Sequence, residues 1–552
     1  MDVETPDLHG AAPRLTEPQL AKIAAHAERR PISAGEILYR EGDCNYDFHV
    51  VADGMVAIFS GYGSSDERLF AVHGRGRFLG ELSLITGQTA FFTAVVQEPG
   101  EVLVLPADRL RELVTNDSEL GDIVLRAYLI RRELAIGFGA GFRIVGSRHS
   151  PDTRRLRDLA ARNHLPHRWV DLENDPAAEA LVAELRIPPE ETPIVIWGDR
   201  VLRNPSNAEV ATIVGLRHTT GAPEIDLIVV GAGPAGLAAA VYGASEGLTT
   251  VVVDGVAAGG QAATSSRIEN YLGFPSGISG AELAERAVIQ AEKFGAELTV
   301  SAEAAALDFR DGRYIVTLDD GTSVSTRAVL IATGAHYRKL GVARLAEFEG
   351  TSVYYAATQM EAQLCTGNPV AIVGGGNSAG QAAVFLSRHA VHVHLLIRGP
   401  DLGKNMSRYL VDQIERNSLV TVWRSTEVRE LEGEGGELTA LVVENNETVR
   451  RSALECRALF VFIGAEPHTG WLGGRLALDP KGFVLTGTDA ANGGDSAPLL
   501  LETSLPGVFA AGDVRSGSSK RCATAVGEGA MAVQFVHARL AGRANTAPAA
   551  PR

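Results

Sequence analysis

The sequence predicts a multidomain protein in which an all-β jelly roll with C-terminal helices precedes three α/β domains. Three observations support this prediction. Short strands with regular turn signals fill the chain up to about Leu105, strands and helices alternate over residues 142–215, and two later apolar strands end abruptly in glycines. A chain of 552 residues has room for several domains of ordinary size.

The composition indicates an acidic, soluble protein. A formal net charge of −16 argues against a nucleic-acid partner or an anionic membrane surface. Residues 1–20 contain no basic start followed by an apolar segment, and no uncharged run elsewhere is convincingly a membrane helix, so we expect a cytoplasmic location. The four cysteines form no CxxC pair, which suggests neither a zinc site nor a disulfide framework: they are Cys44, Cys365, Cys456 and Cys522.

Residues 1–140 are expected to form the first domain. Turn signals such as Asp53-Gly54 separate its short apolar strands, a helix is predicted from about Ala107 to Ala135 with a cap at Asp117, and the glycine-rich residues 136–141 end it.

Two segments of this domain, residues 48–59 and 78–84, resemble the cyclic-nucleotide-binding domain of catabolite-activator-type regulators. In that family a Gly-Glu-Leu segment opens a phosphate-binding cassette, with a glutamate on the ribose and an arginine on the cyclic phosphate. Glu81 matches the glutamate, but Ala90 stands where the arginine is expected. Loss of a charge-assisted hydrogen bond costs a few kcal/mol. Two hypotheses remain open: ordinary cyclic AMP binding, or a degenerate regulatory or docking domain that keeps only the fold.

Residues 141–222 alternate between strand and helix, which predicts a small α/β domain. It resembles the glutaredoxin family, of thioredoxin-like α/β fold, with Thr192-Pro193 in place of the family's Thr-Val-Pro segment, which contains a cis-proline. The family's Cys-Pro-x-Cys falls on residues 150–153, which read Ser-Pro-Asp-Thr. Thiol exchange requires a thiolate, so we expect a structural or binding relic.

Residues 226–240 begin as an apolar strand, end in glycines and continue as a small-residue helix. Gly231 permits a tight turn, Gly233 lets backbone amides approach a pyrophosphate, and Gly236 lets the helix pack on the strand. Asp254 ends the next strand about 20 residues on, where a carboxylate would accept from a ribose hydroxyl.

A stretch of this kind can also be a strand, turn and helix whose glycines serve packing, or a membrane span, because residues 227–245 carry no charge. A second motif makes a nucleotide site the preferred interpretation. Gly374, Gly376 and Ala379 fill the GxGxxG/A positions after another apolar strand. Two such Rossmann-like units in one chain imply two dinucleotides facing each other, the arrangement of a pyridine-nucleotide flavoprotein.

Residues 224–542 resemble the low-molecular-weight thioredoxin reductase family over its full length and in order. The resemblance implies a homodimer that binds FAD through residues 223–337 and 466–545 and NADPH through residues 338–465. In this superfamily Asp513 would lie near the ribityl hydroxyls, and the helix that begins at Lys520 would direct its amides at the pyrimidine end of the flavin. The implied cofactor-binding residues are Gly231, Gly233, Pro234, Ala235, Gly236, Asp254, Gly260, Gln261, Asn270, Thr333, Gly334, Gly374, Gly376, Asn377, Ser378, Ala379, Arg398, Gly512, Asp513, Lys520, Arg521 and Cys522.

Arg398 favours NADPH over NADH. The strand over residues 391–397 ends without a carboxylate, and an arginine after it accommodates a 2′-phosphate. The family usually has two adjacent arginines, whereas Gly399 follows here. His392 and His394 alternate on that strand, and a packed pair is preferred to a metal site because no further ligands cluster nearby.

The redox dithiol of the family is missing. A count back without gaps from Val370 places its two cysteines at Ala357 and Met360. The leading hypothesis is therefore an NADPH-dependent FAD oxidoreductase that passes electrons to a small molecule or a small redox protein without an internal CxxC dithiol and without a side-chain acid or base. The alternatives are a thioredoxin reductase with unconventional cysteines, and a sensor or adaptor whose first domain binds a ligand.

Overall fold

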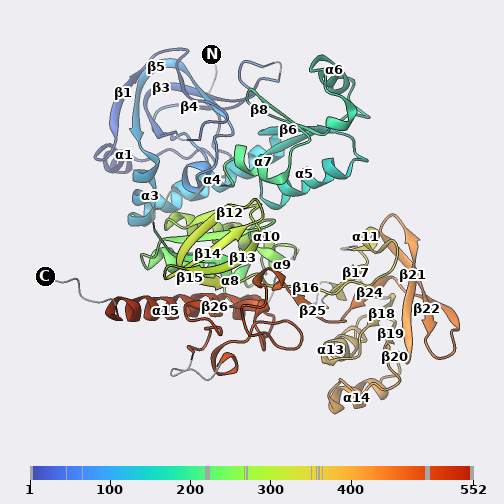
Figure 1. The fold of residues 1–552 in the computed structure, drawn as a ribbon. Coiled ribbons are helices and arrows are strands. Elements are labelled where there is room, and N and C mark those ends of the chain that lie inside the picture. The colour runs from blue at the N-terminus through green and yellow to red at the C-terminus, as the bar shows by residue number, and fades with distance from the viewer. Residues whose placement is uncertain are drawn as a thin grey trace. The chain divides into compact units, whose positions relative to one another are not determined.

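The computed structural model describes residues 4–44, 46–64, 66–217, 224–265, 268, 271–349, 351–355, 357, 361–362, 365–491 and 498–546. The chain divides into two compact units, Met1–Gly334 with His468–Arg552, and Ala335–Pro467. Figure 1 shows the elements of both units. Among the residues described, no helix is both long enough and apolar enough to cross a membrane.

The first part of the larger unit is a β-rich domain with helices at its end. Its five-stranded sheet has the order β1-β5-β3-β4, with β2 also on β5. The single helix predicted over residues 107–135 is in fact two, because Asp117 leaves helical geometry and its carboxylate accepts hydrogen bonds from the amides of Glu119 and Leu120. The elements are α1 (Glu17–Ala24), β1 (Glu28–Ile32), β2 (Ile37–Tyr39), β3 (Phe48–Ser60), β4 (Arg68–His73), α2 (Ser83–Thr86), β5 (Thr93–Leu105), α3 (Ala107–Asn116) and α4 (Ser118–Phe138).

A small α/β domain follows, with a four-stranded sheet of order β7-β6-β8-β9. β6 and β7 are parallel, whereas β8 runs antiparallel to both β6 and β9. The bond between Thr192 and Pro193 is cis. The elements are β6 (Phe142–Gly146), α5 (Pro151–Arg162), β7 (His167–Asp171), α6 (Pro176–Glu184), η1 (Pro189–Glu191), β8 (Ile194–Trp197), β9 (Arg200–Arg203) and α7 (Asn207–Ile213).

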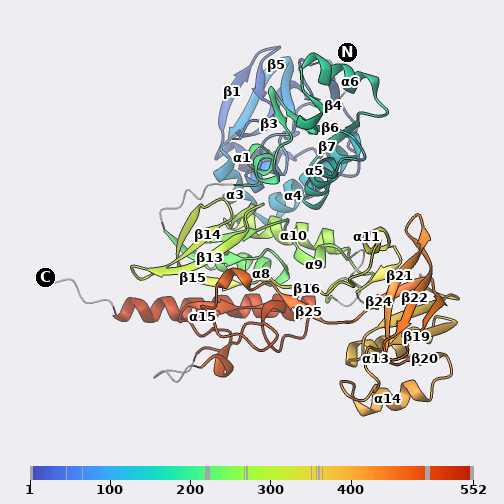
Figure 2. The same ribbon diagram turned by 45° about the vertical axis from the view of Figure 1, so that its right-hand side comes forward.

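The rest of the larger unit is built on a seven-stranded sheet of order β12-β11-β10-β15-β14-β13, with β26 also on β15. α8 packs against both α10 and α15, and Figure 2 shows α15, in red, running beside α8 and β15. The elements are β10 (Ile225–Val230), α8 (Pro234–Ser245), β11 (Thr250–Asp254), α9 (Gly260–Ala263), α10 (Gly280–Lys293), β12 (Glu297–Val300), β13 (Ala304–Arg310), β14 (Arg313–Leu318), β15 (Ser323–Ile331), η2 (Gly470–Leu472), η3 (Gly487–Ala490), β26 (Val508–Ala510), η4 (Gly512–Val514) and α15 (Cys522–Thr546).

The smaller unit contains a parallel sheet of order β17-β24-β18-β19-β20, an antiparallel sheet of order β21-β22-β23, and the pair β16-β25 at its two chain ends. Its elements are β16 (Ala335–Tyr337), α11 (Leu345–Phe348), β17 (Val353–Tyr354), β18 (Pro369–Val373), α13 (Asn377–Leu386), β19 (His392–Leu396), α14 (Arg408–Glu415), β20 (Val420–Trp423), β21 (Thr426–Glu434), β22 (Glu437–Asn445), β23 (Arg451–Glu455), β24 (Ala458–Val461) and β25 (Ala465–Pro467).

Candidate functional site

The first glycine turn joins β10 to α8. Its middle glycine has free space at the Cβ position, whereas neighbouring atoms crowd the Cβ positions of its two outer glycines. Gly231 has a φ of +104°, and a Cβ there would lie 2.4 Å from the carbonyl oxygen of Ala332. A Cβ on Gly236 would lie 1.8 Å from the carbonyl oxygen of Gly231, so both positions need glycine for the protein's own packing. Gly233, the N-cap of α8, has no atom of the described residues within 4 Å of its Cβ position. The helix N-terminus therefore faces open space, which fits a phosphate group.

This turn lies where the strand order of the sheet reverses. β10 pairs in parallel with β11 on one side and β15 on the other, and β26 pairs in parallel with β15. Open α/β sheets bind ligands outside the carboxyl ends of strands at such a point. Thr333-Gly334 follows β15 closely, and Gly512 follows β26, where its Cβ position lies 3.0 Å from the Cβ of Ala235 at the start of α8. Three segments predicted from the sequence therefore meet at one edge of the sheet. They are the start of α8 with Pro234, residues Thr333-Gly334, and residues Gly512-Asp513.

Asp254, at the end of β11, braces the glycine turn. Its carboxylate accepts a hydrogen bond from the amide of Ala232 at 2.8 Å, and bonds from the amides of Val256 at 2.9 Å and Ala257 at 3.1 Å. Burial raises the pKa of this carboxyl group, and the three amide bonds oppose that rise. Asp254 therefore lies beside the turn and holds the turn in shape.

Residues 259–263 lie on the same turn. The amide of Gly259 donates to the carbonyl oxygen of Ala232 at 2.7 Å, and the Cβ position of Gly260 is 3.1 Å from the Cα of Gly233. Gln261 belongs to the short helix α9 that begins here. The predicted contact at Asn270 lies outside the described residues.

A charged side chain, that of Lys520, lies two residues before the start of α15. Lys520 Nζ lies 3.5 Å from the carbonyl oxygen of Asp513 and 4.3 Å from the ring centroid of Phe483. Burial raises the pKa of Asp513 and lowers that of Lys520, while the two charges partly offset both shifts. Arg521 is exposed and Cys522 is half-buried, and α15 begins at Cys522 rather than at Lys520.

Sequence reasoning missed Glu528, which joins Gly512 to α15. Its carboxylate accepts from the amide of Gly512 at 2.7 Å and pairs with the guanidinium of Arg515 at 2.5 Å. The available signal was a lone acidic residue between Gly527 and Gly529 in a small-residue helix, where a buried carboxylate requires partners.

The smaller unit repeats the first turn between β18 and α13. Gly374 has a φ of +148°, and its Cβ position lies 2.4 Å from the carbonyl oxygen of Phe462 and 3.1 Å from the Cβ of Ala379. Gly376 caps α13, and the only described atom near its Cβ position is a carbonyl oxygen 4.0 Å away. Asn377 Oδ1 accepts from the amide of Ser407 at 2.7 Å, and Ser378 follows in the first turn of α13. This turn also leaves room at its middle glycine.

Arg398 is exposed just beyond β19. The rings of His392 and His394 are 4.7 Å apart, His392 bonds to the hydroxyl of Thr421 at 3.0 Å, and Trp423 donates to His394 at 3.2 Å. Within the described ranges no group of three or more His, Cys, Asp or Glu side chains is arranged for a metal ion. The two histidines lie on β19 and pack against each other and against residues of the neighbouring strand β20.

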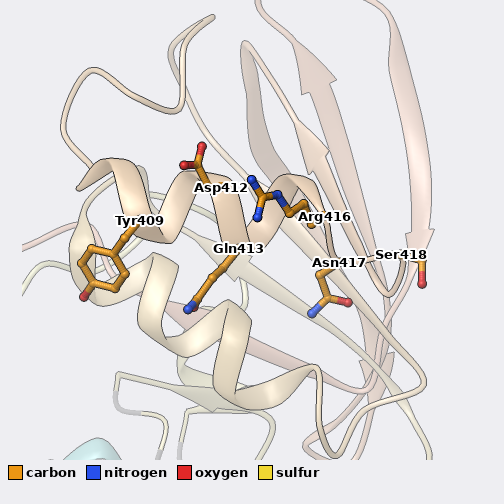
Figure 3. A pocket seen from close by; sticks show the side chains of 6 residues that line it. All are labelled: Tyr409, Asp412, Gln413, Arg416, Asn417 and Ser418. Carbon is orange, nitrogen blue, oxygen red and sulfur yellow. The ribbon is translucent and has the colours of Figure 1, made fainter.

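A surface hollow of the smaller unit lies along α14 and the turn after it (Figure 3). It is lined by Tyr409, Asp412, Gln413, Arg416, Asn417 and Ser418. None of these residues is among the cofactor-binding residues predicted from the sequence.

All four cysteines lie among the described residues and are free thiols. Burial raises the pKa of Cys365 to about 11 and that of Cys456 to about 12. The pKa of the half-buried Cys522 is also raised, by burial and by the charge of Asp513. Thiolates are the reactive form, so these three groups are poor nucleophiles at neutral pH. Of the segment predicted to replace the dithiol, Ala357 is described, and Met360 lies outside the described residues.

In the small α/β domain, Ser150 caps α5 by accepting from the amide of Thr153 at 3.3 Å. These two hydroxyl residues stand at the positions where the sequence comparison expected cysteines. A hydroxyl that serves as a helix cap supplies no thiolate chemistry.

Glu81 lies in the first domain where the resemblance placed it, and its carboxylate accepts from the amide of Phe91 at 3.0 Å. Burial raises the pKa of Glu81 to about 8, with the Phe91 amide and Arg132 acting in the opposite direction. Ala90 is fully buried, and its amide donates to the carbonyl oxygen of Asp43 at 2.9 Å.

The Glu81→Gln variant is expected to gain stability relative to the wild type as the pH rises. Between an unfolded pKa of 4.5 and a folded pKa of about 8 the native state holds a proton that the unfolded state releases, so this carboxyl group lowers stability progressively across that window. Glutamine cannot ionise and still accepts from Phe91. The melting temperatures of both proteins from pH 5 to pH 8 test this, and a difference that is constant with pH would contradict it.

Residues 225–529 match a family profile described as pyridine nucleotide-disulphide oxidoreductase, and residues 29–117 match one described as cyclic nucleotide-binding domain. The chain is 33% identical to NADPH-dependent thioredoxin reductase 3 of Arabidopsis thaliana over 352 residues, which are 61% of this chain and 64% of that protein. It therefore spans less than two thirds of that relative.

Two further comparisons cover nearly the whole of shorter proteins. The chain is 33% identical to a thioredoxin reductase of Eremothecium gossypii over 319 residues, 55% of this chain and 94% of that protein. The crystal structure of thioredoxin reductase from Streptococcus pyogenes MGAS5005 is 31% identical, with a TM-score of 0.49, over 58% of this chain and 99% of that one.

Proposed function

Because the chain belongs to the pyridine nucleotide-disulphide oxidoreductase family, we propose that it is an NADPH-dependent FAD oxidoreductase that delivers electrons to an acceptor without an internal CxxC dithiol. A bound flavin would supply the capacity to accept hydride from NADPH and to transfer electrons onward. One observation supports the two cofactor sites above the others. In the first turn both outer glycines are required by packing, and in the second turn Gly374 is. In each turn the middle glycine, Gly233 or Gly376, caps a helix with room at the Cβ position.

The residues of the larger unit fit FAD. The amides at the start of α8 would receive the pyrophosphate, Asp254 would accept from the adenosine ribose, and Asp513 would accept from the ribityl chain. The amides at the start of α15 would face the pyrimidine end of the flavin, where reduction adds negative charge. In the smaller unit Arg398 would hold the 2′-phosphate of NADPH.

The domain boundaries proposed from the sequence are residues 1–140, 141–222, 223–337 with 466–545, and 338–465. The element order and the sheet order β7-β6-β8-β9 support a thioredoxin-like fold for the second domain, which we propose to be a glutaredoxin-like relic. The homodimer expected from the resemblance stays a prediction.

The acceptor is proposed to be a small molecule or a small redox protein. Purified protein should show a flavin spectrum, and NADPH-driven reduction of ferricyanide, a quinone, ferredoxin and thioredoxin should be compared side by side. Reduction of at least one acceptor other than thioredoxin is expected. A protein that carries no flavin, or that turns over with thioredoxin alone, would contradict the proposal.

A variant with alanine at both Cys365 and Cys522 is expected to keep its NADPH-driven turnover within about twofold of the wild type. Burial holds both thiols in the unreactive protonated form, and alanine keeps the backbone amide through which Cys522 would contact the flavin. Turnover with each acceptor is measured for the double variant and for each single variant. Loss of activity on replacing either cysteine would instead support a thioredoxin reductase with unconventional cysteines.

A further inference from the structure

The cassette of the first domain, residues 78–93, is filled by its own side chains. Phe91 and Phe92 are 1% and 2% exposed, and Phe92 stacks on Phe70 with ring centroids 4.3 Å apart. Every residue from 88 to 93 is buried, including Ala90 at the position of the family's arginine. The carboxylate of Glu81 binds the cassette's own backbone at Phe91. Side chains of the cassette itself therefore fill the surface that would receive a cyclic phosphate.

The small α/β domain covers one side of the cassette. The ring of Trp197 on β8 lies 5.2 Å from that of Phe91. The amide of Thr89 donates to the carbonyl oxygen of Val214 at 3.3 Å, and a Cβ on Gly215 would lie 2.9 Å from the Cα of Gln88. Contacts between backbones at this distance leave no space for a ligand between them.

Helix α10 of the glycine-turn domain covers another side. It packs on α2 and α3, and Ile289 in its C-terminal half is 6% exposed and belongs to the hydrophobic core that the first domain shares with the small α/β domain. Thr115 Oγ1 donates to the carbonyl oxygen of Lys293 at the end of α10, at 3.5 Å. An isoleucine that is buried in the core of another domain indicates a stable, packed interface between the two domains rather than a transient contact.

Charges at this contact are complementary. Arg132 on α4 is buried and donates to Gln88 in the cassette at 2.6 Å, while the carboxylates of Glu285 and Glu292 on α10 favour its charge. Arg132 and Arg111 in turn oppose the effect of burial on the pKa of Glu292, which is nevertheless raised. Glu285, Ile289 and Glu292 recur at four- and three-residue spacing, so one face of α10 presents an apolar centre flanked by acids to a basic partner.

The adjacent face of α10 supports the flavin-binding turn. A Cβ on Gly259 would lie 2.5 Å from the Cβ of Ala284, and a Cβ on Gly280 would lie 1.7 Å from the carbonyl oxygen of Ala262. Residues 259–263 in turn lie against Gly233. One helix thus contacts the cassette on one side and the segment over the predicted pyrophosphate site on another.

We propose that the cassette is an intramolecular docking surface for α10, closed to cyclic nucleotides, and that by holding α10 it keeps residues 259–263 in place over the flavin. The flavin part of this inference rests on the proposed function, whereas the docking part does not. If the first domain separates from α10, the flavin is then expected to be released faster, although the residues that would contact the flavin are unchanged.

The test compares full-length Ile289→Asp and Ile289→Ala with Gln290→Ala, whose side chain on the next position of α10 is exposed. Hydrogen exchange of residues 78–93 and 280–293 measures docking of the first domain on α10. The rate of flavin release measures how firmly residues 259–263 hold the flavin. Exchange in both segments and flavin release are each expected to rise about tenfold or more in the Ile289 variants and to stay unchanged in Gln290→Ala. Millimolar cyclic AMP is expected to leave the melting temperature of the wild type unchanged.

Unchanged exchange in Ile289→Ala, which is the variant less disturbing to folding, would overturn the docking inference, as would stabilisation of the wild type by cyclic AMP. Faster exchange with an unaltered rate of flavin release would overturn the inference that docking of α10 helps residues 259–263 to hold the flavin. A wild type without flavin would contradict the proposed function, and the exchange data would still decide docking.

Discussion

The Gly233→Ala variant is expected to fold like the wild type and to bind flavin about 10- to 100-fold more weakly. No described atom lies within 4 Å of the added Cβ, and the φ of −70° suits alanine. The methyl group would instead occupy the space through which a pyrophosphate reaches the amides of α8, and hydrogen bonds to charged groups contribute about 1.5–3 kcal/mol each. Flavin affinity by fluorescence and apo-protein melting temperature together check this.

The matched variant is Gly236→Ala, in which the methyl group would meet the carbonyl oxygen of Gly231 at 1.8 Å. It is expected to lower the melting temperature of the apo-protein as well as flavin content, because the clash lies within the protein. If Gly233→Ala keeps wild-type flavin affinity, the open space at the start of α8 is not the pyrophosphate site.

Replacement of Arg398 by alanine is expected to raise the KM for NADPH about 10- to 100-fold and to leave the KM for NADH nearly unchanged. The exposed guanidinium would lose its charge-assisted bonds to a 2′-phosphate that NADH lacks. Steady-state kinetics with both nucleotides measures the effect. Arg416→Ala, which removes an arginine from the hollow along α14, serves as the control and should alter neither constant. Equal losses with the two nucleotides would remove Arg398 from the 2′-phosphate site.

The glycine turns were predictable because their requirement is local. Gly231 and Gly374 have left-handed or otherwise glycine-favoured backbone, and the strand before each and the helix after each are apolar over the expected lengths. Asp254 could be placed for the same reason, since the end of a strand fixes its position beside the turn. That it also binds three backbone amides could not be read from its spacing.

Other features depend on segments far apart in the chain. Glu528 gained its role only when α15 returned to Gly512. The division of the helix predicted over residues 107–135 is local by contrast, because the side chain of Asp117 caps α4 where the predicted helix would continue.

The sequence by itself determined the family resemblance, the two glycine turns, the replacement of the family's arginine by Ala90 and the absence of a CxxC pair, since each is a matter of residue identity and spacing. Only the tertiary structure decided what the cassette contacts. Ile289, Trp197 and Gly215 reach it from other domains, and burial of apolar surface carries no periodic signal that links positions so distant in the chain.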